Sequence, residues 1–294
     1  MVQFPEDSDS SSFLYLQPRL DRPMNSVACI VPYYKDQGTL IHTLRSLVAQ
    51  TLPLDQIILI NDGCNLSDRE IGSIKDACQG FSGELIWVCL IQNSGVSTAR
   101  NMGLGLCNSS HVAFCDSDEI WHIQKNELQM SILDNSPDLG LVCFEDMRSA
   151  SPDLTTWESH QNRFSDLNIW EFILKNPIIL SSVCCRFEPN IRFDERLVVA
   201  EDLNLWFCLI RQRRIKVRKY PIGMVFPLFG RYRMSGLSGH ADKMLISLLA
   251  VFSFWCFKGS GDLRGRLAIL FGLIFVVPRV MVSCCLRVYH GLCR

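Results

Sequence analysis

The sequence has no excess of positive charge, because 29 lysines and arginines are balanced by 30 aspartates and glutamates, for a formal net charge of -1. A general nucleic-acid-binding protein would show a basic excess, so we expect no nucleic-acid partner. None of the 14 cysteines stands in a Cys-x-x-Cys pair, which argues against a zinc ribbon. The N-terminus lacks the apolar core of a signal peptide, so we expect reduced cytoplasmic thiols that pack as small hydrophobes.

Two common nucleotide-binding signatures are also missing. No Gly-x-Gly-x-x-Gly follows the first apolar run, which argues against a dinucleotide-dependent dehydrogenase. No Gly-x-x-x-x-Gly-Lys-Ser/Thr is present, which argues against a phosphate-loop ATPase.

What the chain does contain is a regular alternation of apolar strands and amphipathic helices. Strands are predicted at 27–31, 56–60, 85–91 and 112–115, the first closed by Pro32, and helices at 39–50, 67–78 and 96–106. Ser67 and Glu70 have the spacing of a capping box. The pattern predicts an α/β fold with a central, mainly parallel sheet flanked by helices. Ligands of such sheets bind at the carboxyl ends of the strands.

Two carboxylates, Asp116 and Asp118, directly follow the fourth predicted strand. In extended backbone, residues two apart point to the same side, so the carboxylates would repel each other and a divalent cation would relieve that repulsion. The same spelling at Asp7 and Asp9 has no strand before it, so the tripeptide alone also fits a solvated acidic turn. The loops that leave the four strands would meet at one edge and suit a nucleotide diphosphate with a metal.

Six short motifs stand in a fixed order along the chain. They are Ile30-Val31-Pro32-Tyr33-Tyr34, Gln50-Thr51, Ile60-Asn61-Asp62-Gly63, Asn93-Ser94-Gly95-Val96-Ser97-Thr98-Ala99-Arg100-Asn101, Phe114-Cys115-Asp116-Ser117-Asp118 and Ala200-Glu201-Asp202-Leu203-Asn204-Leu205-Trp206. In this order they resemble glycosyltransferase family 2 over about residues 26–240. The resemblance implies a GT-A fold, a nucleotide-sugar donor and a divalent metal, Mn2+ or Mg2+.

On the donor side, the resemblance implies that Pro32 and Tyr34 flank the base and that Asp62 hydrogen-bonds its edge. Arg100 would lie near the ribose or diphosphate, although an arginine at this place could also cap or pair on a helix surface. Asn61 stands where the family often has aspartate, which leaves the identity of the base open.

For the metal and the chemistry, the resemblance implies that Asp118 is the direct metal ligand and that Asp116 reaches the ribose and the metal shell. Asp202 would be the general base that deprotonates the acceptor hydroxyl, with Glu201 in a supporting, donor-side role. Both acids begin a predicted helix, where acidic residues are also favoured by the helix dipole alone.

Two later segments carry further candidate sites. Residues 231–240 resemble the family's mobile loop over the diphosphate, with Arg233 as a donor contact and His240 as a metal contact; a basic surface loop is the other interpretation. The basic run 211–219 is typical of a solvated helix end and could also face acidic lipid.

We expect four regions. They are a flexible leader at 1–25, a nucleotide-sugar-binding half at 26–120, an acceptor-binding and catalytic half at 121–240, and an apolar helical tail at 241–294. The tail is interrupted by glycine and proline and edged by arginine, which favours helices lying in the cytoplasmic leaflet over a clean span. A helical cap on the core, or a dimer contact, is the alternative.

The resulting functional hypothesis is an inverting, metal-dependent hexosyl transfer from a nucleotide sugar, UDP-linked by expectation, to a hydroxyl of a surface polysaccharide or glycolipid. The partners would be the donor, a glycan or lipid-linked acceptor and a peripheral membrane contact at the cytoplasmic face. Two alternatives remain: a non-catalytic nucleotide-sugar or glycan binding protein on the same fold, and a membrane anchor that supports a partner transferase.

Overall fold

The computed structural model describes residues 22–35, 37–146, 161–174, 176–188, 190–212 and 214–228 and, nearer the C-terminus, residues 247–249, 251, 254–255 and 274. The chain divides into two compact units. The first comprises Met1–Asp166, Ile178–Arg192 and Lys216–Leu228, and the second Leu167–Pro177, Phe193–Ile215 and Phe229–Arg294. Most of the predicted leader, the loop with Arg233 and His240, and most of the predicted tail lie outside the described residues.

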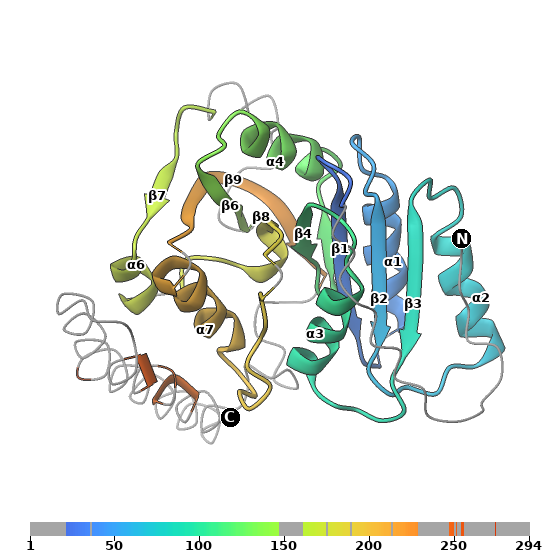
Figure 1. The fold of residues 1–294 in the computed structure, drawn as a ribbon. Coiled ribbons are helices and arrows are strands. Elements are labelled where there is room, and N and C mark those ends of the chain that lie inside the picture. Colours follow the sequence, from blue (N-terminus) through green and yellow to red (C-terminus); the bar gives the residue numbers. More distant parts are fainter. Residues whose placement is uncertain are drawn as a thin grey trace, which may run out of the picture. The chain divides into compact units, whose positions relative to one another are not determined.

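The first unit begins with the predicted strand–helix alternation. The strands are β1 (Val27–Tyr33), β2 (Gln56–Asn61), β3 (Glu84–Cys89) and β4 (His111–Phe114), and the helices between them are α1 (Gln37–Val48), α2 (Asp68–Ala77) and α3 (Val96–Leu106). The strands pair in parallel in the order β3-β2-β1-β4 (Figure 1). The predicted capping box is confirmed, because Ser67 N donates to Glu70 Oε2 at 2.6 Å and Glu70 N donates to Ser67 Oγ at 3.4 Å.

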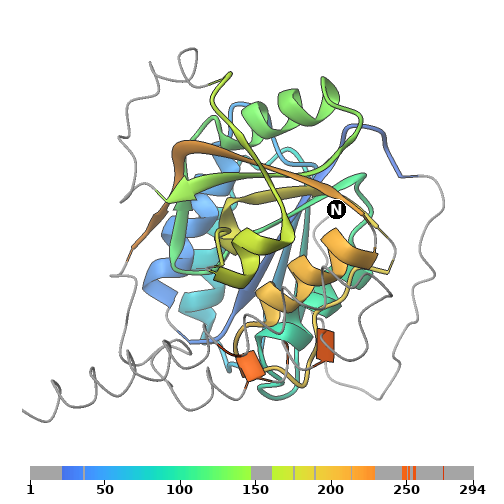
Figure 2. The same cartoon turned by 90° about the vertical axis from the view of Figure 1, so that its left-hand side faces the viewer.

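The same sheet continues with strands that the sequence does not predict. They are β5 (Glu119–Trp121), β6 (Leu139–Asp146), β7 (Ser165–Leu167), β8 (Val183–Arg186) and β9 (Lys216–Pro227), with α4 (Lys125–Asp134) before β6 and the 3-10 turn η2 (Leu180–Ser182) before β8. β8 is antiparallel to both β4 and β6, whereas β9 follows β6 in parallel (Figure 2). The α/β prediction is confirmed, and the sheet is mixed, though mostly parallel.

The two faces of this sheet pack against different helices. One face of β1 belongs to a core cluster with α1 that includes Val27, Cys29, Val31, Leu40, Leu44 and Leu47. Each fully buried aliphatic side chain of this kind contributes about 1.5–3 kcal/mol. On the other face α3 approaches closely, because a Cβ on Gly103 would lie 2.5 Å from Ile30 Cγ2. This close packing fixes the position of α3 against β1.

Cysteines line the core of the first unit, and all ten described cysteines of the chain are free thiols. Burial raises the pKa of the Cys143 and Cys184 thiols to about 12. Near them lies a buried lysine, Lys125, whose Nζ donates to Gln129 Oε1 at 2.8 Å and sits 3.5 Å from the ring centroid of Trp121. Burial lowers the pKa of Lys125 to about 8. The expectation that cysteines pack as small hydrophobes is confirmed for Cys143 and Cys184, which are fully buried.

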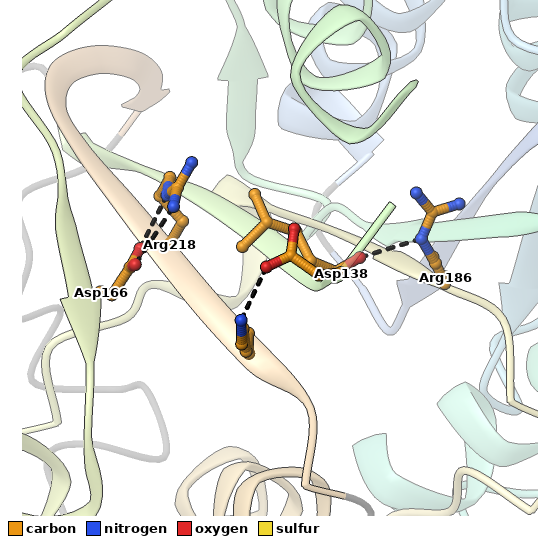
Figure 3. Close-up of polar contacts among 6 residues, drawn as sticks. Asp138, Asp166, Arg186 and Arg218 are labelled. Carbon is orange, nitrogen blue, oxygen red and sulfur yellow. Dashed lines mark hydrogen bonds and ion pairs between the residues drawn. The ribbon is translucent and has the colours of Figure 1, made fainter. Parts of the chain in front are cut away.

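The basic run 211–219 is not a helix end throughout, so that prediction is wrong for its second half. β9 begins at Lys216, and three of its cations form ion pairs: Lys216 with Asp138 at 2.7 Å, Arg218 with Asp166 at 2.7 Å, and Lys219 with Glu145 at 2.8 Å. Figure 3 shows Arg218 facing Asp166 across the two strands. The acidic partners are far away in sequence, so the run alone gives no sign of them.

The second unit contains α6 (Ile169–Leu174), α7 (Glu201–Phe207) and the π-helical turn η3 (Cys208–Gln212). The predicted tail contributes Trp255, which is buried and donates from Nε1 to Asn204 Oδ1 at 2.9 Å. Trp255 therefore contacts α7. Among the residues that the structure describes, no helix is both long enough and apolar enough to cross a bilayer.

Candidate active site

The candidate donor site lies where the parallel strands of the first unit end. β1, β2, β3 and β4 run in the same direction, so the loops that leave them meet at one edge of the sheet. The chain goes from β1 to β2 on one side and returns, through α3, to β4 on the other. Ligands of open α/β sheets bind where the strand order reverses in this way.

Pro32 does not end β1, contrary to the prediction. β1 continues beside β2 to the pair Tyr33↔Asn61, and the Tyr33 carbonyl accepts from Asp62 N at 2.8 Å. Successive residues of a strand point their backbone groups to opposite neighbours, so Pro32 faces β4. Its missing N–H therefore stops the ladder with β4, which ends at Ile30↔Phe114, and leaves the ladder with β2 intact. Pro32 itself is buried, whereas Tyr34 is 44% exposed.

Asp62 joins two of the loops at this edge. Its Oδ1 accepts from Ser94 N at 2.7 Å and its Oδ2 from Gly95 N at 3.0 Å, and the residue is 3% exposed. Gly95 is the N-cap of α3, so the carboxylate stabilises the start of that helix. A carboxylate has about four acceptor positions, so Asp62 retains capacity for a further donor such as a base N–H.

The residues around Asp62 tighten the same turn. Asn61 accepts from Cys64 N at 2.8 Å and donates to Cys64 O at 2.7 Å, so its amide closes the loop after β2. Gly63 has φ +80°, and a Cβ there would overlap the backbone of Gln92 and Asn93. The asparagine at position 61, where the family often has aspartate, is thus explained by the turn, because of these two side chains only the amide can both donate to Cys64 O and accept from Cys64 N.

Arg100 and Asp116 form an ion pair beside these loops. Arg100, from α3, donates from Nη2 to Asp116 Oδ1 at 2.8 Å. The arginine side chain is 4% exposed and the aspartate side chain 40% exposed. Asp116 N also donates to Ser181 Oγ of η2 at 2.9 Å. The structure thus brings the predicted Arg100 to the predicted Asp116 and leaves part of the carboxylate at the surface.

Asp116 and Asp118 lie in a turn and not in extended backbone, so the assumption that they share the alternation of a strand is wrong. β4 ends at Phe114, and Glu119 N donates to Asp116 O at 3.1 Å, as in a four-residue turn. Leu228 N donates to Asp118 O at 2.8 Å, and Thr43 Oγ1 donates to Ser117 O at 3.0 Å. The turn is therefore fixed from β9 and α1.

The residues at this turn fit a hard divalent cation in a limited sense. Across the described part of the chain, no group of three or more His, Cys, Asp or Glu side chains could hold a metal alone. Mg2+ usually takes one or two carboxylates and completes its shell with substrate phosphates. Asp116 and Asp118 are the two carboxylates of this turn and so match that donor set in number and type, and Arg100 offsets part of the charge of Asp116.

The acid pair lies in the second unit, at the first turn of α7 as predicted. Ala200 is the N-cap, in a left-handed conformation with φ 60°. Asp202 Oδ2 accepts from Asn176 Nδ2 at 2.7 Å, and Asp202 Oδ1 accepts from Leu203 N at 2.7 Å. Glu201 stands beside Asp202 in the same turn.

The sequence does not predict Ser181 or Asn176 at these sites. Ser181 accepts a hydrogen bond from the backbone of Asp116, 65 residues earlier. Asn176 donates a hydrogen bond to Asp202, 26 residues later. Neither belongs to a motif, so no local signal marks them.

A family model described as Glycosyl transferase family 2 matches residues 28–188. Among curated relatives, the minor teichoic acid biosynthesis protein GgaB of Bacillus subtilis is 27% identical over 207 residues, which is 65% of this chain and 22% of GgaB. An uncharacterized glycosyltransferase of Rickettsia felis is 25% identical over 78% of this chain and 36% of its own length. The chain thus spans about a fifth to a third of these relatives.

Solved structures show the same fold at low sequence identity. S. aureus TarS 1-349 in complex with UDP-GlcNAc superposes with a TM-score of 0.63 at 15% identity and covers 84% of this chain and 71% of that one. The mannosyltransferase PcManGT from Pyrobaculum calidifontis, in complex with GDP-Man and Mn2+, has a TM-score of 0.63 at 14% identity and covers 93% and 76%.

Proposed function

The chain belongs to glycosyltransferase family 2, and from this premise we propose that it transfers a hexose, with inversion, from a UDP-sugar to a hydroxyl of a cell-surface polymer. The observation that carries the proposal is the Arg100–Asp116 pair at the end of β4, beside the loop that Asp62 caps. The relatives GgaB and TuaG of Bacillus subtilis are named for teichoic and teichuronic acid biosynthesis, which supports a polymer acceptor. TarS has been solved with UDP and with UDP-GlcNAc, which supports a UDP-linked donor.

On the donor side, Asp62 accepts a hydrogen bond from the base, while the backbone amides it organises hold the loop before α3 in place. Tyr34 flanks the base at the sheet edge, and Arg100 keeps Asp116 turned toward the ribose. Asp116 and Asp118 would hold a Mn2+ or Mg2+ ion together with the phosphates of the donor. When bound, such an ion offsets the charge that grows on the leaving diphosphate.

On the acceptor side, Asp202 acts as the general base. It takes the proton of the acceptor hydroxyl while that oxygen forms a bond to the anomeric carbon and the bond from this carbon to the diphosphate oxygen breaks. A single displacement of this kind inverts the anomeric centre. Glu201, in the same helical turn, supports the site.

We place the protein at the cytoplasmic face of a membrane. Leu249, Phe254 and Ile274 are apolar and exposed, at 39%, 42% and 54%. The exposed apolar side chains suit the headgroup region of a bilayer, where basic residues of the same segment would meet anionic lipid.

The first test is donor binding with and without metal. A thermal-shift screen of UDP-glucose, UDP-galactose, UDP-GlcNAc and GDP-mannose, each with Mn2+ or with EDTA, should single out a UDP-sugar, because a ligand at 100 times its Kd adds about 2.7 kcal/mol of stability. Equal shifts with GDP-mannose and the UDP-sugars would contradict the assignment of the base.

The second test removes the proposed metal ligand. We expect Asp118→Ala to lose Mn2+-dependent affinity for the selected donor, measured by titration calorimetry. Asp9→Ala is the matched control, because Asp7-Ser8-Asp9 is the same kind of Asp-Ser-Asp tripeptide with no strand predicted before it. An unchanged affinity in Asp118→Ala means that the turn after β4 is not a metal site.

A further inference from the structure

Asp202 is held by a residue that belongs to none of the motifs. Asn176 follows α6 in the second unit, and its Nδ2 donates to Asp202 Oδ2 at 2.7 Å. The other oxygen, Oδ1, accepts from Leu203 N at 2.7 Å, within the same helix as Asp202. One contact is therefore local to α7, and the other comes from a separate segment of chain 26 residues earlier.

The chemistry of the donor matters for a carboxylate that has to accept a proton. A cationic partner such as arginine would form a charge-assisted pair and make the carboxylate a weaker base. The amide of asparagine donates a hydrogen bond without carrying charge and has no proton to release. It can thus orient a carboxylate with less loss of basicity than an ion pair would cause.

The helix that carries Asp202 is fixed independently of Asn176. Asn204 N donates to Ala200 O at 3.1 Å, which closes the first turn of α7. On Asn204 itself, Oδ1 accepts from the buried Trp255. Loss of the Asn176 amide should therefore remove this one restraint on the carboxylate while α7 stays in place.

We propose that Asn176 is a positioning residue for the general base: its amide fixes the orientation of the Asp202 carboxylate toward the acceptor hydroxyl. This inference rests on the proposed function, in which Asp202 removes the proton of the acceptor. Misplacement of a reacting group by about 1 Å can cost on the order of 100-fold in rate. Asn176 should therefore act on turnover and not on donor binding.

The experiment measures release of UDP from UDP-GlcNAc with Mn2+ present, water serving as the acceptor, together with donor affinity by calorimetry. We expect Asn176→Leu to lower kcat about 10- to 100-fold with donor affinity unchanged. Asn176→Gln, which keeps the amide on a longer chain, should recover part of kcat. Asn176→Asp keeps the shape but replaces the donor by a second acceptor, and should lose turnover while folding normally.

A matched control separates positioning from stability. Asn168 caps α6 in the same unit, where its Oδ1 accepts from Trp170 N at 2.9 Å. Asn168→Leu should lower the thermal midpoint and leave kcat unchanged. If Asn168→Leu lowers kcat as much as Asn176→Leu, the effect of Asn176 is structural and the proposal is overturned.

A double-mutant cycle distinguishes failure of this inference from failure of the proposed function. In an Asp202→Asn background, Asn176→Leu should cause no further loss of turnover. An equal loss in both backgrounds overturns the positioning role. If Asp202→Asn alone abolishes turnover but both Asn176→Leu and Asn176→Asp retain it, the inference fails and the proposed function stands. If Asp202→Asn retains turnover, the assignment of the base fails and takes the inference with it.

Discussion

The carboxylates of the two units are held by different kinds of partner. In the first unit, Asp116 pairs with the buried Arg100 guanidinium, and Asp62 accepts from two backbone amides at the start of α3. In the second unit, Asp202 accepts from the neutral amide of Asn176 and from the backbone of its own helix.

This difference separates two tasks. The buried guanidinium beside Asp116 is a positive charge, which keeps a carboxylate anionic and suits a side chain that binds a ligand or a cation. A neutral donor orients a carboxylate with less loss of basicity, which suits a group that has to take up a proton. Binding and turnover should therefore respond to different substitutions.

The largest expected effect concerns Asp202, the carboxylate that accepts from a neutral amide. Asp202→Asn keeps the shape of the side chain but removes its basicity, so we expect turnover to fall by about 10²–10⁴-fold with donor affinity unchanged. Steady-state release of UDP and calorimetric titration measure the two quantities. Near wild-type turnover would show that Asp202 serves only as a charge at the helix start.

The next largest effect concerns the ion pair of Asp116 with Arg100. Asp116→Ala leaves a 4% exposed guanidinium without its carboxylate, whereas Arg100→Met leaves a 40% exposed carboxylate that water can reach. Breaking a fully buried pair costs about 3–5 kcal/mol, so we expect about 2–3 kcal/mol for Asp116→Ala and a smaller loss for Arg100→Met. Urea unfolding gives both values, and the reverse order would contradict this view of the pair.

A smaller effect is expected at Asp62. Asp62→Ala removes the acceptor of Ser94 N and Gly95 N, and loss of such a cap costs about 0.5–2 kcal/mol of stability. Affinity for a UDP-sugar should fall as well, because the loop before α3 loosens. Asp62→Asn keeps one acceptor oxygen and should fall between the wild type and Asp62→Ala in unfolding experiments; equal stability of all three would refute the capping role.

The smallest effect concerns the helix that delivers Arg100. Gly103 and Gly105 both lie in α3, but a Cβ on Gly103 would press on Ile30, and a Cβ on Gly105 would meet nothing within 4 Å. Gly105→Ala should therefore stabilise the protein by about 0.5–1 kcal/mol through helix propensity, whereas Gly103→Ala should not. Thermal unfolding of the two variants measures this, and equal gains would mean that α3 does not rest closely on β1.

The parallel half of the sheet could be predicted from the sequence because its signals are local. Four apolar runs end in polar turns, and Ser67 with Glu70 marks a helix start within four residues. The predictions are wrong only where strands end. Pro32 does not close β1, because its missing N–H affects the pairing with β4 and not the pairing with β2.

The other half could not be predicted because its signals depend on distant partners. β9 starts inside a run of cations, and only Asp138, Asp166 and Glu145 explain why these cations lie in a strand. At the candidate sites, Asp116 and Asp202 were found through their motifs. Their partners Ser181 and Asn176 carry no motif and become visible only in the folded chain.

The thiol-lined core ties the stability of the first unit to proton uptake. An unfolded thiol loses its proton near pH 9, but Cys143 and Cys184, with pKa values of about 12, retain theirs in the folded state. Their contribution is therefore complete below pH 9 and is lost as the pH rises to about 12. Lys125, with its pKa lowered to about 8 from 10.5, has the opposite sign between those two values. A core that packs cysteines as hydrophobes thus makes the stability of this unit fall at alkaline pH, and the buried amine of Lys125 offsets part of that loss.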